Sequence, residues 1–282
     1  MLRRRFNERQ VGHAGTLDPD ATGVLLVGIG RATRLLRFLT DLGKTYSGEV
    51  VFGTTTDSLD STGVVTGTFD MSGLSESKVR EVVQRHLTGA IEQIPPMVSA
   101  VKVDGRKLYE LAREGVEIER APRPVVIHRF DVAATSDPLV YSIEVQCSKG
   151  TYIRTLAADL GTALGGGAHL RNLRRTSVGP FTLDEALALE AVAPDRVLPM
   201  VAAVRHLSST TVGGEMADAV AVGKVLEADE LELAGEGPWA VLGPDGALLA
   251  VYESFRGTTV KPSLVIPPLA EVPADPDPAT GA

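Results

Sequence analysis

The order of hydrophobic patterns along the chain restricts its fold more than any other feature of the sequence. Segments with apolar residues at helical spacing occur at 32–39, 75–88, 105–115 and 153–160. Before and between them lie apolar, β-branched runs typical of strands, at 24–28, 45–53, 124–134 and 139–148. These segments do not alternate strictly as strand, helix, strand, which disfavours a parallel sheet of βαβ units. We therefore expect an α+β fold with a mixed, largely antiparallel sheet and flanking helices.

The character of the chain changes near Leu207. From there, short β-prone runs alternate with turn signals such as Gly243-Pro-Asp-Gly246, a pattern typical of a small β domain. Residues 267–282 contain five prolines and no aromatic residue, which is typical of disorder. We predict a large domain over 1–205, a small C-terminal β domain over 206–268 and a disordered tail over 269–282.

The single cysteine, Cys147, excludes an intramolecular disulfide and a cysteine-based zinc site, and we expect it in the core. No run approaches the roughly 18 apolar residues needed to span a bilayer. The arginine-rich start lacks the apolar region of a secretory signal. The sequence therefore predicts a cytoplasmic protein without a membrane partner.

The formal net charge of −8 alone would argue against a nucleic-acid partner. The acidic excess, however, lies in residues 205–282, which hold 4 basic and 12 acidic side chains. Residues 1–37 hold 7 basic and 3 acidic side chains, and residues 149–175 hold 5 and 1. The total charge therefore does not exclude nucleic-acid binding by these two basic segments.

The segment from Val11 to Thr22 combines glycines, a proline, a histidine and two carboxylates just before an apolar run. Loops of this kind present reactive groups at a sheet edge. Asp18 precedes Pro19, which restricts its backbone to extended geometry and so limits where the carboxylate points. An isolated Asp-Pro pair is typical of a turn. The neighbouring His13 and glycines favour a functional interpretation here.

Two other motifs lie within or shortly after this segment. Asp18-Pro-Asp20-Ala-Thr22 matches the D-x-D-x-T pattern of haloacid-dehalogenase-type phosphatases, but the residues before it do not form a buried strand. Gly28-x-Gly30-x-x-Thr33 resembles a dinucleotide-binding fingerprint, but the third glycine is missing. Neither interpretation is retained.

Three of the five tyrosines stand near basic residues. They occur in Lys44-Thr-Tyr46, Lys107-Leu-Tyr109 and Lys149-Gly-Thr-Tyr152-Ile-Arg154. An aromatic ring beside a cation suits a flipped-out nucleobase, which needs a stacking face and phosphate contacts. A single tyrosine in such a place more often packs at the end of a strand or helix with its hydroxyl in water.

Five motifs together resemble the TruB family of tRNA pseudouridine synthases. They are Gly12-His-Ala-Gly-Thr-Leu-Asp-Pro-x-Ala-Thr-Gly23, Lys44-x-Tyr46, Ser99-Ala-x-Lys-x-x-Gly-x-Lys-Leu-Tyr109, Ser148-Lys-Gly-Thr-Tyr-Ile-Arg154 and Ala168-His-Leu-x-x-Leu-Arg-Arg175. The resemblance implies a pseudouridine synthase fold, a PUA-like C-terminal domain, and isomerisation of uridine 55 in the T loop of tRNA without cofactor or metal. A family segment of the type Lys-Pro-x-Gly-x-Ser/Thr-Ser is not found before Val11. We therefore expect either that the given chain starts late or that its start codon was assigned downstream, with a cost to stability and to some RNA contacts.

The resemblance also implies roles for the reacting groups. Asp18 is the catalytic carboxylate, which as an ionised group acts as nucleophile or base. Attack on C1′ of the sugar and attack on C6 of the base both remain open. Arg154 pairs with Asp18 and orients it. Asp20 departs from the small or hydrophobic residue expected there, and we predict that it is dispensable.

The remaining predicted site residues contact the substrate or support the site. Tyr46 stacks on the uracil, Tyr152 lines the pocket and could take part in removing the C5 proton, and Leu173 forms an apolar wall. His13 contacts the RNA beside the extruded nucleotide; a turn-capping histidine is the alternative. Asp57 supports the site through hydrogen bonds or is a solvated loop residue.

We expect the partner to be tRNA, bound through its T arm, and the protein to be a monomer. A non-catalytic tRNA-binding or chaperone protein is the alternative from another class. Release of tritium from C5-labelled uridine distinguishes the two, because it requires turnover.

Overall fold

The computed structural model describes residues 1–99, 102–103, 105–116 and 118–267. The chain forms two compact units that divide between Pro194 and Asp195, whereas the sequence predicts a boundary between 205 and 206. The predicted disordered tail, 269–282, lies outside the described residues. Within the described part of the chain, no helix is long and apolar enough to cross a membrane.

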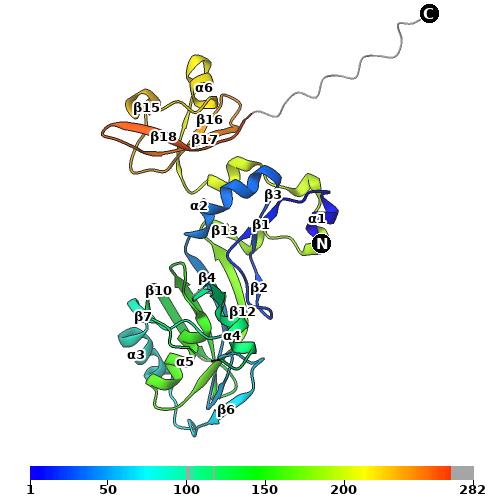
Figure 1. Ribbon diagram of the computed structural model, residues 1–282. Coiled ribbons are helices and arrows are strands. Elements are labelled where there is room, and N and C mark those ends of the chain that lie inside the picture. Colours follow the sequence, from blue (N-terminus) through cyan, green and yellow to red (C-terminus); the bar gives the residue numbers. More distant parts are fainter. Residues whose placement is uncertain (100–101, 104, 117, 268–282) are drawn as a thin grey trace, which may run out of the picture. The chain divides into compact units, whose positions relative to one another are not determined.

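A seven-stranded sheet forms the centre of the first unit (Figure 1). Its strands, in spatial order, are β13 (Phe181–Thr182), β12 (Ala168–Val178), β4 (Lys44–Phe52), β11 (Val140–Cys147), β10 (Arg123–Ala134) and β7 (Gly89–Gln93). These strands pair antiparallel, and β2 (Thr22–Gly23) joins β12 in parallel. The structure thus confirms the predicted α+β class with a mixed, largely antiparallel sheet.

Two helices, α3 (Glu76–His86) and α5 (Ile153–Ala163), bury their apolar sides in the core that they share with this sheet. The core combines Val79 of α3 and Leu156 of α5 with inward residues of the strands, such as Val145. Strand β11 alternates buried and exposed residues along most of its length, as period-two patterning requires. Helix α5 thereby packs against the sheet, and its first turn carries Arg154.

The N-terminal segment forms a separate antiparallel pair, β1 (Val11–Ala14) and β3 (Leu26–Ile29). The connection between them contains Asp18 and continues into β2, so one loop reaches from this pair to the central sheet. The predicted helix over 32–39 is a 3₁₀ helix (Gly30–Leu35) followed by α2 (Leu36–Thr40). The Thr33 hydroxyl donates to the Gly30 carbonyl at 2.7 Å, a local bond that competes with regular helix formation.

The other elements of the first unit are short. They are α1 (Leu2–Arg5), β5 (Thr54–Thr56), β6 (Val65–Thr68), β8 (Lys102–Val103), β9 (Arg106–Lys107), α4 (Leu108–Arg113), and 3₁₀ turns at Leu183–Glu185 and Leu189–Ala191. Strands β5 and β6 pair antiparallel, as do β8 and β9. The predicted helix over 105–115 is therefore shorter than expected, because its first residues belong to the β8–β9 hairpin.

The second unit contains a five-stranded sheet with its own core around Val220, Trp239 and Tyr252. Its strands, in spatial order, are β14 (Ser208–Thr211), β16 (Trp239–Leu242), β17 (Leu248–Ser254), β18 (Thr259–Val265) and β15 (Leu226–Glu227). Its helices are α6 (Gly214–Ala221) and 3₁₀ turns at Met200–Val204 and Asp229–Leu231, and a further 3₁₀ turn, Pro194–Arg196, spans the division of the chain. This sheet is the C-terminal β domain that the sequence predicts.

Candidate active site

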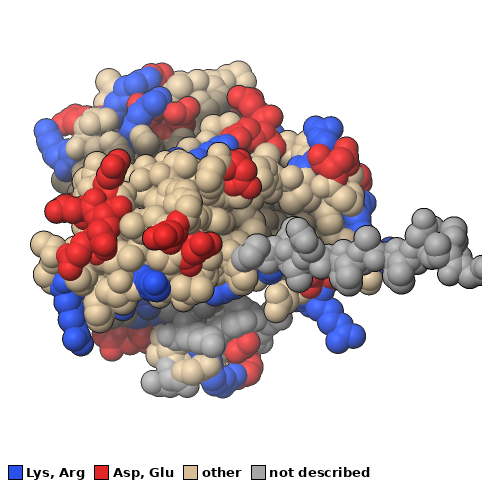
Figure 2. Space-filling model, turned by 90° about the horizontal axis from the view of Figure 1, so that it is seen from above, with Lys and Arg blue, Asp and Glu red and all other residues tan. Residues whose placement is uncertain are grey.

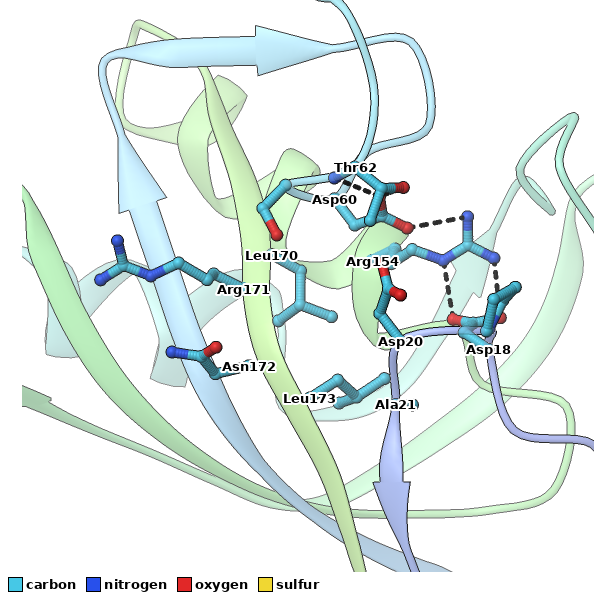
Figure 3. Close-up of a pocket in the computed structure, with 12 residues that line it drawn as sticks. Asp18, Asp20, Ala21, Asp60, Thr62, Arg154, Leu170, Arg171, Asn172 and Leu173 are labelled. Atoms are coloured by element: carbon cyan, nitrogen blue, oxygen red, sulfur yellow. Dashed lines mark hydrogen bonds and ion pairs between the residues drawn. The ribbon is translucent and has the colours of Figure 1, made fainter.

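A pocket of about 270 Å³ opens where the Asp18 loop meets strand β12 (Figure 3). Its lining comes from residues 18–21, 60–62, Arg154 and 170–173. Four segments that are distant in sequence therefore converge on one cavity. Three of the predicted site residues, Asp18, Arg154 and Leu173, are among those that line it.

Asp18 and Arg154 form a two-pronged ion pair at this pocket (Figure 3). The Arg154 Nε donates to Oδ2 of Asp18 at 2.8 Å, and Nη2 donates to Oδ1 at 3.0 Å. Such a parallel pair fixes the plane of a carboxylate as well as its position. The Arg154 side chain is 4% exposed and that of Asp18 is 37% exposed, so a rigid buried cation holds a carboxylate that solvent or a ligand can reach.

The rest of the Arg154 guanidinium is also held. Nη1 donates to the Ser58 carbonyl at 2.9 Å, and Nη2 also donates to the Val98 carbonyl at 2.9 Å. The Asp60 carboxylate lies 3.6 Å from Nη1. Arg154 therefore has fixed partners around its fork, which leaves it little freedom to turn away from Asp18.

Asp60 is an acidic residue of this site that the sequence analysis did not select. Burial alone raises the pKa of Asp60, but hydrogen bonds from the Thr62 and Ser58 side chains and the Thr62 amide, with the charge of Arg154, outweigh it and lower the pKa. The predicted supporting residue, Asp57, is exposed, and its Oδ1 accepts from the Val64 amide at 2.9 Å. The segment Thr-Asp57-Ser-Leu-Asp60 contains two carboxylates. Their spacing alone does not show which carboxylate faces Arg154.

Gln93 is a second residue that sequence reasoning missed. Its buried side-chain amide donates to the Tyr152 carbonyl at 3.1 Å and accepts from the Tyr152 amide at 3.0 Å. Tyr152 is the N-cap residue of α5, so these two bonds fix the chain just before Arg154. Gln93 stands at the end of a short strand-like run, and nothing in that sequence pattern predicts that its side chain binds the backbone of Tyr152.

Leu173 reaches the pocket because strand β12 is irregular. The register with β4 shifts between Arg171 and Arg174, and Asn172 adopts a left-handed φ of 55°. Glu49 stabilises the bulge by accepting from Arg171 Nε and from Asn172 Nδ2, both at 2.8 Å. Such bulges re-aim neighbouring side chains. In Figure 3, Leu173 extends to the Asp18 side of the strand, whereas Arg171 and Asn172 point to the other side.

The other predicted contact residues are not among those that line the pocket. Tyr46, on β4, is half-buried and packs against the core of the sheet. Burial raises the pKa of the Tyr46 hydroxyl, and the charge of the nearby Arg175 opposes this rise. Tyr152 is half-buried before α5, and His13 is exposed on β1, opposite Val27.

The three carboxylates that line the pocket do not form a metal-binding cluster. Within the residues that the structure describes, no group of three or more His, Cys, Asp and Glu side chains is close enough to hold a metal ion. Asp18 is engaged with Arg154, and Asp60 accepts hydrogen bonds from Ser58 at 2.7 Å and from the Thr62 hydroxyl at 2.6 Å.

Comparison with solved structures defines the class of protein. The fold is similar to that of the Cbf5-Nop10-Gar1 complex, with a TM-score of 0.71 and 25% identity over 94% of this chain and 79% of that one. It is also similar to an H/ACA RNP bound to a substrate RNA containing 2′-deoxyuridine, with a TM-score of 0.68 and 22% identity, which shows the fold alone. The large unit therefore has the pseudouridine synthase fold.

Comparison with protein families defines the group within that class. The N-terminal domain of the TruB family pseudouridylate synthases matches residues 3–153, and the C-terminal domain of tRNA pseudouridylate synthase B matches residues 154–205. The chain belongs to the TruB family. It is 42% identical to tRNA pseudouridine synthase B of Arthrobacter sp. (strain FB24), covering 96% of this chain and 92% of the relative. It is 40% identical to tRNA pseudouridine synthase B of Bacillus licheniformis, covering 94% of this chain and 91% of the relative.

Proposed function

We propose that this protein is a tRNA pseudouridine synthase that converts uridine 55 in the T loop into pseudouridine, with Asp18 as the reacting carboxylate. The observation that carries the proposal is the two-pronged pair of Asp18 and Arg154 at an open pocket. The relatives named tRNA pseudouridine synthase B support tRNA as the substrate class.

The reaction is an isomerisation. The bond between N1 and C1′ breaks, a bond between C5 and C1′ forms, the C5 hydrogen leaves as a proton, and N1 gains one. No electrons are gained or lost overall. An ionised carboxylate can begin this sequence as a nucleophile, at C1′ of the sugar or at C6 of the base. Arg154 keeps Asp18 oriented, and its low exposure places the guanidinium charge in a water-poor wall.

The surrounding residues would hold the extruded nucleotide. Leu173 provides an apolar wall beside the carboxylate, and Tyr46 a stacking face for the uracil. Tyr152, the residue before α5, takes part in removing the C5 proton. His13, exposed on β1, contacts the RNA chain, and Asp57 supports its loop through the bond to Val64.

The proposal also covers partners and location. The substrate is bound through the T arm by a monomer in the cytoplasm, and the small β domain is a PUA-like RNA-binding module. The two basic segments, 1–37 and 149–175, contain Asp18 and Arg154 respectively, and this supports a phosphate-rich partner at the pocket.

Tritium release from a T-arm hairpin with C5-labelled uridines tests the proposal. The wild-type protein should release tritium only when a uridine occupies position 55, and a hairpin with cytidine there should release none. Asp18→Asn should bind the hairpin but release nothing, because the amide is no longer a nucleophile or base. Asp20→Asn is the matched control in the same pocket and should retain activity.

Two results would contradict the proposal. Substantial turnover by Asp18→Asn would exclude Asp18 as the reacting group. Binding of the hairpin by the wild-type protein without tritium release would instead favour a tRNA-binding or chaperone protein.

A further inference from the structure

Arg175 is a buried cation that the proposed chemistry does not use. It lies on β12, two residues after Leu173, and its side chain is among the largest fully buried ones, with 1% exposure. Its guanidinium donates to three backbone carbonyls: Nε to Val24 at 2.7 Å, Nη2 to Gly15 at 3.1 Å and Nη1 to Thr16 at 3.5 Å. Burial of a charge is costly. A buried guanidinium that donates to three carbonyls therefore indicates that the structure requires these contacts.

The three acceptors lie on both sides of Asp18 in the sequence. Gly15 and Thr16 precede the aspartate by a few residues, and Val24 follows it. A single guanidinium therefore ties together the two ends of the loop that carries Asp18. A lysine at the same position could not reach all three carbonyls at once, because its donors radiate from one nitrogen.

The backbone of Arg175 reinforces this connection. Its carbonyl accepts from the Val24 amide at 2.9 Å, and Arg175 pairs with Gly23 where β2 joins β12. Gly23 has a φ of 105°, and a Cβ there would lie 2.1 Å from the Arg175 carbonyl oxygen. The loop thus approaches the strand as closely as a glycine permits.

The same residue faces the tyrosine that we propose to stack on the base. Arg175 and Tyr46 are directly opposite each other in the β12–β4 pairing. Burial raises the pKa of the Tyr46 hydroxyl, and the nearby charge of Arg175 opposes this rise. Arg175 therefore holds the loop of the reacting carboxylate and lies opposite Tyr46 on the neighbouring strand.

We propose that Arg175 is a positioning residue that sets the Asp18 loop and the Tyr46 ring in one fixed geometry. This inference rests on the proposed role of Asp18. Arg175 itself touches neither substrate nor reacting atoms. It acts through the carbonyls of Gly15, Thr16 and Val24, which determine where the loop places its carboxylate.

Arg175→Lys tests the inference through the single-turnover rate of tritium release and the dissociation constant of tRNA. The rate should fall by about 10- to 100-fold, because a displacement near 1 Å is enough to disturb a reacting pair. The dissociation constant should change less than about threefold, since the contacts with RNA remain. Val83→Ala, a truncation in the core on α3, is the control for lost stability and should keep the wild-type rate.

An unchanged rate in Arg175→Lys, a loss confined to tRNA binding, or an equal loss in Val83→Ala would each overturn the inference. None of these results would affect the proposed function, which depends on the activity of the wild-type protein and of Asp18→Asn.

Hydrogen exchange of the wild-type protein tests the inference without a variant, in case Arg175→Lys does not fold. Peptides that cover residues 15–24 should exchange as slowly as those of β12, because the guanidinium and the Val24 amide hold the loop to the strand. Rapid exchange throughout this loop in the absence of RNA would overturn the inference.

Discussion

Asp60 lies beside the Arg154 guanidinium. The direction of its pKa shift predicts how its contribution to stability changes with pH. Its pKa is lowered from an ordinary value of 3.8, since hydrogen bonds and the charge of Arg154 outweigh the effect of burial. A carboxyl group whose pKa is lower in the folded state than in the unfolded state stabilises the protein at any pH above its unfolded-state pKa. This stabilisation is lost as the pH falls through the folded-state pKa.

We therefore predict that Asp60→Asn is less stable than the wild-type protein near neutral pH and that the difference narrows below about pH 4. Urea unfolding of both proteins from about pH 7 down to about pH 3 would measure it. Asp70→Asn is the comparison, since Asp70 also has a lowered pKa but is fully exposed and not among the residues that line the pocket. Its stability difference should change with pH in the same direction but by less, because solvent screens an exposed charge. A stability difference that does not change with pH would contradict the assigned electrostatic role of Asp60.

At the scale of elements, regular patterning was a reliable guide to the sheet and its helices. The strand expected over 139–148 is β11, and the helix expected over 75–88 is α3. Ser75 caps the start of α3, because its hydroxyl accepts from the Lys78 amide at 3.4 Å. In these elements the buried side chains follow the helical or strand periodicity of the apolar residues. The local sequence is therefore sufficient to predict them.

Strand β12 shows where local sequence is insufficient. Its residues, Ala168–Val178, include three arginines and an asparagine in a left-handed conformation, and two register shifts interrupt its pairing with β4. Such irregularities interrupt the strict alternation of buried and exposed side chains along a strand. The motif in this segment predicted Leu173 as a pocket residue, but the role of Arg175 depends on a loop distant in sequence that only the fold brings near.

The junction of β2 with β12 provides a prediction at this scale. Gly23→Ala would place a Cβ within 2.1 Å of the Arg175 carbonyl in a backbone conformation that favours glycine. We expect a loss of at least about 1 kcal/mol in the free energy of unfolding, together with reduced activity because the Asp18 loop must shift. Thermal unfolding and tritium release measure the two effects.

Gly73→Ala is the control, because a Cβ there meets nothing within 4 Å. It should leave both stability and activity close to those of the wild-type protein. A Gly23→Ala protein with unchanged stability would contradict the close approach of loop and strand.

At the scale of the whole molecule, the formal charge of −8 conceals an uneven distribution. Residues 205–282 account for the acidic excess, whereas the segments that contain Asp18 and Arg154 are basic. On the face drawn in Figure 2, acidic side chains gather in several clusters, and basic side chains lie beside several of these clusters. Total charge is therefore a poor guide to the partner of this protein.

If the basic segments bind phosphates, affinity for tRNA must depend on salt in spite of the negative total. We predict that log K falls linearly with log salt concentration, with a slope steeper than about −3, as expected when several phosphates are neutralised. Binding titrations of Asp18→Asn with unmodified tRNA, which avoid turnover, measure this slope. A slope near zero would contradict phosphate binding by these segments.

Mapping of pseudouridine in an unmodified tRNA transcript tests the proposed reaction at the resolution of single nucleotides. After incubation with the protein, carbodiimide modification and reverse transcription locate each pseudouridine to a single nucleotide. We predict one new pseudouridine, at position 55, with the wild-type protein, and none with Asp18→Asn at concentrations that saturate binding. Absence of pseudouridine with the wild-type protein, its formation only at another position, or its formation by Asp18→Asn at a comparable rate would contradict the account.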